Sequence, residues 1–168
     1  MLCSGLANGG DCRECRTRRP GWWPPMRRTQ FGAVMNLSAL HHISLVTSDL
    51  ERSARFYREV LGLHEIARPP FKLAGKWLVS GPVQVHLIAN AAGTFRANAT
   101  VDLDDTHFAL RVDDFEQAIT HLTSSGYRQD AAEDDPMRLV VRRAGVAGYP
   151  QAYLRDPDGN IVEINADI

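Results

Sequence analysis

The chain has 168 residues, of which 44% are hydrophobic, and a formal net charge of −1. This length suits one domain or two small fused halves. The sequence contains no run of about 18 apolar residues, so we expect no membrane span. Residues 35–168 hold 13 Lys and Arg against 18 Asp and Glu. An acidic body of this kind argues against nucleic acid as a partner.

The first 34 residues differ from the rest. They are rich in Gly, Pro and Arg, show no hydrophobic periodicity, and lack the apolar stretch of a secretory signal. They contain all three cysteines, and Cys12 and Cys15 have no second pair that would complete a zinc site. We interpret 1–34 as a disordered tail or as sequence that is not translated, with Met35 as the start of the folded domain, 35–168. A body without cysteines is typical of the reducing cytoplasm, which we expect to be the location.

The body contains the same unit twice, because "HISLVTSDLE" (42–51) aligns with "HFALRVDDFE" (107–116) at an offset of 65 residues. In each stretch the apolar residues alternate, which predicts a strand. Helices are predicted at about 49–61 and 114–125. Ser48 with Glu51, and Asp113 with Glu116, have capping-box spacing at the helix starts. A glycine follows the end of each helix, as a left-handed cap requires.

Strand-like segments broken by turn residues follow each helix. In the first unit they lie at about 63–67, 76–80 and 83–89, and in the second at about 127–129, 137–143, 151–155 and 160–165. Each unit is therefore β-α-β-β-β, at about 37–90 and 104–166, and the predicted fold class is α+β.

Alternation assigns the side chains of each strand to two faces. On the first strand of each unit, the face opposite the apolar one carries His42 and His107 respectively. On the last strand of each unit, the corresponding face carries His86 and Glu163. Each unit thus offers two potential metal ligands at related positions.

A carboxylate in the centre of a buried strand is costly unless it is paired, and a metal ion would remove that cost. Imidazole and carboxylate ligands suit Zn, Ni, Mn or Fe(II). A single histidine in such a strand is more often a hydrogen-bonded, half-buried residue. Four candidate ligands at repeated positions favour one divalent metal ion bound by His42, His86, His107 and Glu163.

The segments "LHHISLVTSDLERSARFYREVLGL", "THFALRVDDFEQAITHLTSSGY" and "YLRDPDGNIVEIN" resemble the vicinal oxygen chelate superfamily, over about residues 37–166. That superfamily includes glyoxalase I, methylmalonyl-CoA epimerase, extradiol dioxygenases, and fosfomycin and bleomycin resistance proteins. The resemblance implies two βαβββ modules whose curved mixed sheets enclose a metal cleft. It also implies His42, His107 and Glu163 as the common ligands, with His86 where glyoxalase I has a glutamate.

The resemblance implies chelation of a small substrate that carries two adjacent oxygens, with the metal as Lewis acid and Glu163 as the proton-moving group. We favour a glyoxalase-like (lactoylglutathione lyase-like) lyase or isomerase. An Fe(II) extradiol-type dioxygenase is the first alternative, because Tyr153 through Glu163 match half of its pattern. An antibiotic resistance protein, or a metal-free binding protein, is the second.

Four further residues are candidates for substrate binding: Ser44, Arg111, Tyr153 and Trp77. For Arg111 the pattern favours a strand-end surface residue over a substrate ligand, and the two aromatic residues are equally consistent with the core. Two units per chain offer two half-sites, which close on each other or are completed by a second chain. We expect a two-fold homodimer that places His42 and His86 of one chain opposite His107 and Glu163 of the other.

Overall fold

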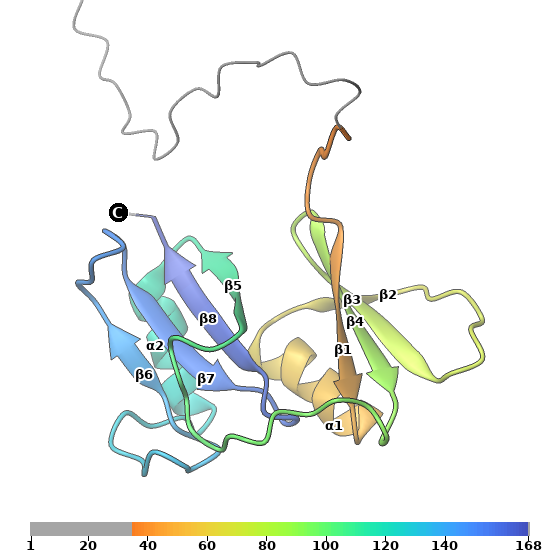
Figure 1. Cartoon of the computed structure of the whole chain (residues 1–168). Helices are drawn as coiled ribbons and strands as arrows, with labels where there is room; N and C mark the ends of the chain where they lie inside the picture. Colours follow the sequence, from red (N-terminus) through yellow and green to blue (C-terminus); the bar gives the residue numbers. More distant parts are fainter. Residues whose placement is uncertain (1–34, 168) are drawn as a thin grey trace, which may run out of the picture. The chain divides into compact units, whose positions relative to one another are not determined.

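The computed structural model describes residues 35–167, and its folded unit begins at Ala39. The interpretations of residues 1–34 lie outside the described residues. The elements follow one another in two similar series (Figure 1). The first series is β1 (His42–Thr47), α1 (Leu50–Arg55), a π-helical turn (Phe56–Val60), β2 (His64–Ile66), β3 (Gly75–Ser80) and β4 (Val83–Ala89). The second is β5 (His107–Val112), α2 (Phe115–Ser124), β6 (Val140–Arg142), β7 (Gln151–Arg155) and β8 (Ile161–Ala166).

Each series forms a four-stranded mixed sheet, with the order β1-β4-β3-β2 in sheet A and β5-β8-β7-β6 in sheet B. In both sheets the first strand pairs in parallel with the last, and the other neighbours are antiparallel. The repeated α+β architecture predicted from the sequence is therefore confirmed. The segment at 127–129 was predicted as a strand but contributes only an isolated bridge, between Arg128 and Arg138.

The helix starts lie one residue later than the predicted capping boxes. The side chain of Asp49 accepts a hydrogen bond from the backbone N–H of Arg52, and Asp114 does the same for Gln117. An N-cap carboxylate satisfies one of the free N–H groups at a helix start, so these aspartates replace Ser48 and Asp113 as the caps.

The helix ends follow the prediction. Gly62 and Gly126 have φ angles of +72° and +98°, as expected for left-handed caps. The first helix ends in a π-helical turn, in which the N–H of Leu61 donates to the carbonyl of Phe56 five residues earlier. No helix among residues 35–167 is long and apolar enough to cross a membrane.

The core lies between the helices and one face of each sheet. Val85 and Leu78 of sheet A and Val162 and Leu154 of sheet B are fully buried, as is Tyr57 of the π-helical turn. Because neighbouring residues of a strand point to opposite faces, burying these residues turns His86 and Glu163 toward the other face of each sheet.

The turn between β7 and β8 connects the second series to the first. The Asp158 carboxylate accepts hydrogen bonds from the backbone N–H and the hydroxyl of Ser48 (2.9 and 2.7 Å) and from the hydroxyl of Ser53 (2.5 Å). The Tyr57 hydroxyl donates to Asp156 at 2.7 Å. These contacts join residues about 100 positions apart, so the Asp-Pro-Asp-Gly turn holds the N-terminal end of α1 and the π-helical turn.

Candidate functional site

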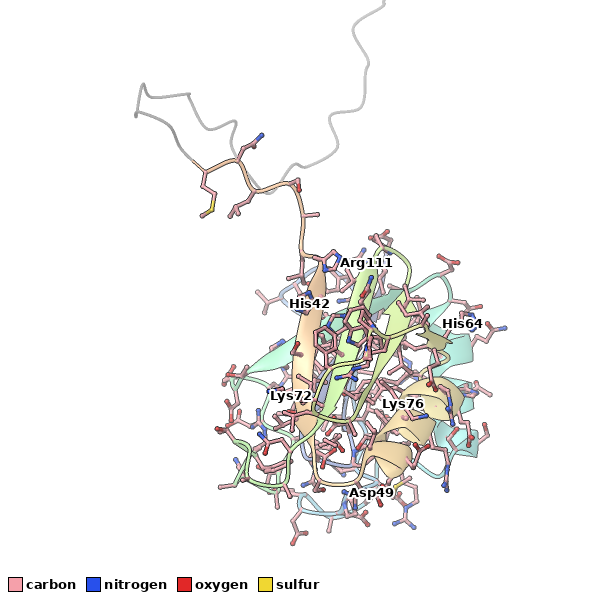
Figure 2. The ribbon with its side chains drawn as sticks, turned by 90° about the vertical axis from the view of Figure 1, so that its right-hand side faces the viewer. His42, Asp49, His64, Lys72, Lys76 and Arg111 are labelled. Carbon is pink, nitrogen blue, oxygen red and sulfur yellow. The ribbon has the colours of Figure 1, made fainter. Side chains whose placement is uncertain are left out.

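The face of sheet A opposite its helix carries three stacked rings. His42 lies at the start of β1 (Figure 2), which pairs with β4 so that Ser44 lies opposite His86. Trp77 of β3 also lies opposite His86. The His86 ring is therefore placed between two others, with its centroid 4.2 Å from that of His42 and 4.2 Å from that of Trp77.

The His86 ring is also fixed along its edge. Its Nε2 lies 2.8 Å from Oε1 of Gln84, on the same face of β4, and only 7% of the residue is exposed. Burial lowers the pKa of His86, and the nearby charges of His42, His41 and Arg68 lower it further. His86 is therefore held as a neutral imidazole with its Nε2–H donated to Gln84.

His42 is exposed, and its Nδ1 lies 2.9 Å from Nδ1 of His41. This contact occupies Nδ1 of His42 and leaves Nε2 available for another partner.

The open face of sheet B brings His107 and Glu163 together. Nε2 of His107 lies 3.4 Å from Oε2 of Glu163. Nδ1 of the same ring lies 2.8 Å from the carbonyl oxygen of Asp105, and since a carbonyl only accepts, Nδ1 carries the proton. Nε2 is therefore the ring nitrogen that faces Glu163 and is not bound to the backbone. A ring oriented in this way is typical of a histidine that ligates a metal.

Glu163 is a buried carboxylate, only 4% exposed, with its two oxygens in different surroundings. Oε1 accepts hydrogen bonds from the side-chain amides of Asn165 (2.8 Å) and Gln151 (3.1 Å), whereas Oε2 faces His107. Burial by itself would raise the pKa of Glu163, but hydrogen bonds from Asn165, Gln151 and Tyr153 and the charge of His107 hold it below its ordinary value. Glu163 is thus kept ionised, with one oxygen free of amide donors.

Tyr153 lies beside this carboxylate, because it is opposite Glu163 in the pairing of β7 with β8. Its hydroxyl accepts a hydrogen bond from Gln151 at 2.7 Å, and burial together with Glu163 raises its pKa to about 12. Arg111 instead pairs with Asp167 and lies over the ring of Tyr149, 5.5 Å from its centroid. Ser44 is exposed and lies opposite His86, as its predicted face requires.

The sequence analysis did not find Gln151 and Asn165. The signal for Asn165 is its position two residues after Glu163, on the same face of β8. Gln151 lies directly opposite Asn165 in the pairing of β7 with β8. Only the register of that pair brings Gln151 to the carboxylate, and the register is not visible in the sequence.

The predicted ligands form two pairs, His42 with His86 on sheet A and His107 with Glu163 on sheet B. Within the part of the chain that the structure describes, no three His, Cys, Asp or Glu side chains lie close enough to hold a metal ion. The donor types nevertheless fit a divalent ion of the Zn, Ni, Mn or Fe(II) kind. Glu163 supplies an ionised, buried oxygen, and His42 and His107 each have one ring nitrogen occupied and the other available.

Residues 39–164 match the family model described as the Glyoxalase/Bleomycin resistance protein/Dioxygenase superfamily. The chain belongs to this superfamily. The predicted resemblance is therefore confirmed, and the matched region covers both modules of the fold.

Individual members of the superfamily resemble the chain at modest identity. "Glyoxylase I 4" of Arabidopsis thaliana is 26% identical over 135 residues, which cover 79% of this chain and 73% of that protein. "Glutathione transferase FosA" of Serratia marcescens is 29% identical, covering 77% and 81%. A putative glyoxalase family protein from Bacillus anthracis has a TM-score of 0.64 at 18% identity, covering 81% of this chain and all of that one. This structural similarity supports the fold, and the superfamily's several activities leave the reaction open.

Proposed function

We propose that this protein is a metal-dependent enzyme that acts on a small substrate with two adjacent oxygens, as a glyoxalase-like lyase or isomerase. The observation that carries this proposal is Glu163. An ionised carboxylate that is only 4% exposed is costly unless a positive charge compensates it. Its Oε2 has no amide donor and faces Nε2 of His107 at 3.4 Å, and Nδ1 of that ring is bound to the carbonyl of Asp105. A divalent cation between the two groups would satisfy both.

The ligands in this proposal are His42, His107 and Glu163. When bound, the metal would polarise a substrate oxygen as a Lewis acid. The chain's own residues orient the carboxylate and move the proton. Gln151 and Asn165 hold Oε1 of Glu163 in place, and Oε2 is the atom that contacts the ion or accepts a proton from the substrate. Tyr153 borders the carboxylate, and its raised pKa keeps its hydroxyl protonated as a hydrogen-bond donor.

The site is shared between two copies of the chain in this proposal. The ligands of one chain form two pairs on two separate sheets, and each pair lacks the partners that complete an ion site. β1 and β5, which carry His42 and His107, are both edge strands of their sheets. A two-fold dimer can therefore bring sheet A of one copy against sheet B of the other and build two equivalent sites.

Two other activities within the superfamily remain candidates. A site of two histidines and one carboxylate is also the ligand set of non-haem Fe(II) oxygenases, and the Tyr153–Glu163 proximity agrees with the dioxygenase half-pattern. The similarity to the FosA glutathione transferase favours testing fosfomycin as well.

The test combines metal loading with a substrate panel. The full chain is loaded in turn with Zn²⁺, Ni²⁺, Mn²⁺ or Fe²⁺ and assayed with the methylglyoxal–glutathione adduct, with catechols, and with fosfomycin plus glutathione. We expect turnover of the adduct, and loss of that turnover in Glu163→Gln but not in the surface control Glu116→Gln, whose exposed carboxylate pairs with Arg143. Catechol cleavage with Fe²⁺ alone would instead assign the dioxygenase.

Sharing of the site is tested by mixing two inactive variants. His42→Ala and Glu163→Ala each damage one half of every site. If sites form between chains, mixed dimers contain one intact site, and up to about a quarter of native activity returns after subunit exchange. Activity that stays at zero in a verified heterodimer would place the whole site within one chain.

A further inference from the structure

The ring of His86 is restrained on both faces and along one edge. One face stacks on Trp77 with an interplanar angle of 7°, and the other face stacks on His42 with an angle of 16°. Along the edge, Nε2 is 2.8 Å from Oε1 of Gln84. Phe71 extends the row of rings, with its centroid 5.9 Å from that of Trp77.

This stacking conflicts with direct coordination of one ion by both histidines. A metal ion binds an imidazole nitrogen along its lone pair, in the plane of the ring, at about 2.0–2.1 Å. Since the rings of His42 and His86 are nearly parallel and 4.2 Å apart, an ion in the plane of one ring lies well outside the plane of the other. Bringing one nitrogen of each ring to a single ion therefore requires the stack of His42 on His86 to break.

The same contacts suit a positioning role. His42 is exposed on an edge strand, so little else restrains its side chain. Stacking against a ring that is itself fixed limits the rotation of His42, while the contact of its Nδ1 with His41 leaves Nε2 free. Ligands that are held in place by outer partners bind metals more tightly, because less conformational freedom is lost on binding.

We propose that His86 is not a metal ligand, and that it is the middle ring of a Trp77–His86–His42 stack that positions His42 for the ion. This inference rests on the proposed function, and it replaces the fourth ligand predicted from the sequence. Gln84 holds the edge of His86, so the stack is fixed by the pairing of β3, β4 and β1. Three protein ligands leave coordination positions for both oxygens of a chelating substrate.

The decisive variants separate the ring from its nitrogens. His86→Phe keeps a flat ring between Trp77 and His42 but has no atom that can bind a metal. The half-exposed Gln84 then turns to water for its hydrogen bond. His86→Ala removes the ring as well. Zn²⁺ affinity is measured for the full chain by competition with a chromophoric chelator, and thermal unfolding of each metal-free variant verifies the fold.

We expect His86→Phe to keep Zn²⁺ affinity within about threefold of the native chain. His86→Ala should lose about tenfold, the size of an outer-partner effect, and His42→Ala more than about a hundredfold. A loss in His86→Phe as large as in His86→Ala, or larger, would overturn the positioning role and restore His86 as a ligand. A native chain that binds no Zn²⁺ would overturn the proposed function and this role together.

A second measurement needs no variant at His86. The native full chain, labelled with ¹⁵N, is loaded with ¹¹³Cd²⁺, and scalar coupling between the cadmium and the imidazole nitrogens is recorded. Coupling to His42 and His107 with none to His86 is the expected result. Coupling to His86 would refute the assignment even if the Phe variant failed to fold.

Discussion

Replacing Tyr57 with Phe tests the contact between the Asp-Pro-Asp-Gly turn and the first module. Tyr57 is fully buried, and its hydroxyl donates to Oδ2 of Asp156, itself only 5% exposed, at 2.7 Å. The variant leaves three of the four donors to this carboxylate, the backbone N–H groups of Asp158 and Asn160 and the Asn160 amide. A hydrogen bond to a charged group contributes about 1.5–3 kcal/mol. We expect the free energy of unfolding at pH 7 to fall by about 2 kcal/mol.

For a folded domain of this size, a loss of about 2 kcal/mol in the free energy of unfolding corresponds to a decrease in Tm of roughly 6–10 °C, measured by circular dichroism. The matched control is Tyr127→Phe, because the hydroxyl of that buried tyrosine donates at 3.2 Å to a neutral acceptor, the carbonyl of Arg155. Tyr127→Phe should lower the free energy of unfolding by about 1 kcal/mol. Equal losses in the two variants, or a decrease of less than about 1 °C in Tyr57→Phe, would refute the charged hydrogen bond.

The pH dependence of Tyr57→Phe has a defined sign. Burial raises the pKa of Asp156, while the Tyr57 hydroxyl and the Asn160 amide act in the opposite direction. The Tyr57 hydroxyl stabilises the ionised carboxylate of Asp156. Removing the hydroxyl therefore lowers the free energy of unfolding most at pH values above the pKa of Asp156. The difference between native and variant should shrink as the pH falls through that pKa, because a protonated carboxyl forms only an ordinary hydrogen bond.

Three other substitutions, one of them with a matched control, probe separate features. Hydrogen bonds to the first module outweigh burial and lower the pKa of Asp158, so Asp158→Asn should destabilise the protein at pH 7 by about 1–2 kcal/mol in urea unfolding. The difference is fully present above about pH 3.9, the pKa of an aspartate in the unfolded chain. It should disappear as the pH falls through the lower pKa that Asp158 has in the folded protein. Gly126 has a φ of +98°, so Gly126→Ala should lower the free energy of unfolding by about 1–2 kcal/mol. The control is Gly145→Ala, because a Cβ at that position makes an ordinary 3.6 Å contact. Its free energy of unfolding should change by less than about 0.5 kcal/mol. Gln151→Leu removes a donor to Glu163 and should weaken Zn²⁺ binding by about 10–100-fold in titration calorimetry; unchanged affinity would refute its role.

The fold was largely predictable because it depends on local patterns that occur twice. Alternating apolar residues in 42–47 and 107–112 give β1 and β5 with the predicted outward faces. The 65-residue offset is preserved in the structure, where Asp49 and Asp114 both cap helices. The prediction missed the caps by one residue because each helix start offers two good capping residues in a row, and only the hydrogen bond three residues later distinguishes them.

The surroundings of the candidate ligands were not predictable to the same extent. Trp77 meets His86, and Gln151 meets Glu163, only because particular residues are opposite one another in antiparallel pairs. Pairing register depends on the whole sheet and on its turns, so a single sequence does not reveal it. The faces of His42, His86, His107 and Glu163 followed from alternation, whereas the stacking of the first two required the three-dimensional structure.

The most direct test of the account is the metal content of the full chain. The protein is purified without chelating agents or nickel resin and analysed by mass spectrometry beside Glu163→Gln. The account predicts about one divalent ion per chain in the native protein, from two equivalent shared sites in a dimer, and a loss of that ion in the variant. A native protein that retains no metal after incubation with Zn²⁺, Ni²⁺, Mn²⁺ and Fe²⁺ in turn would contradict the central claim.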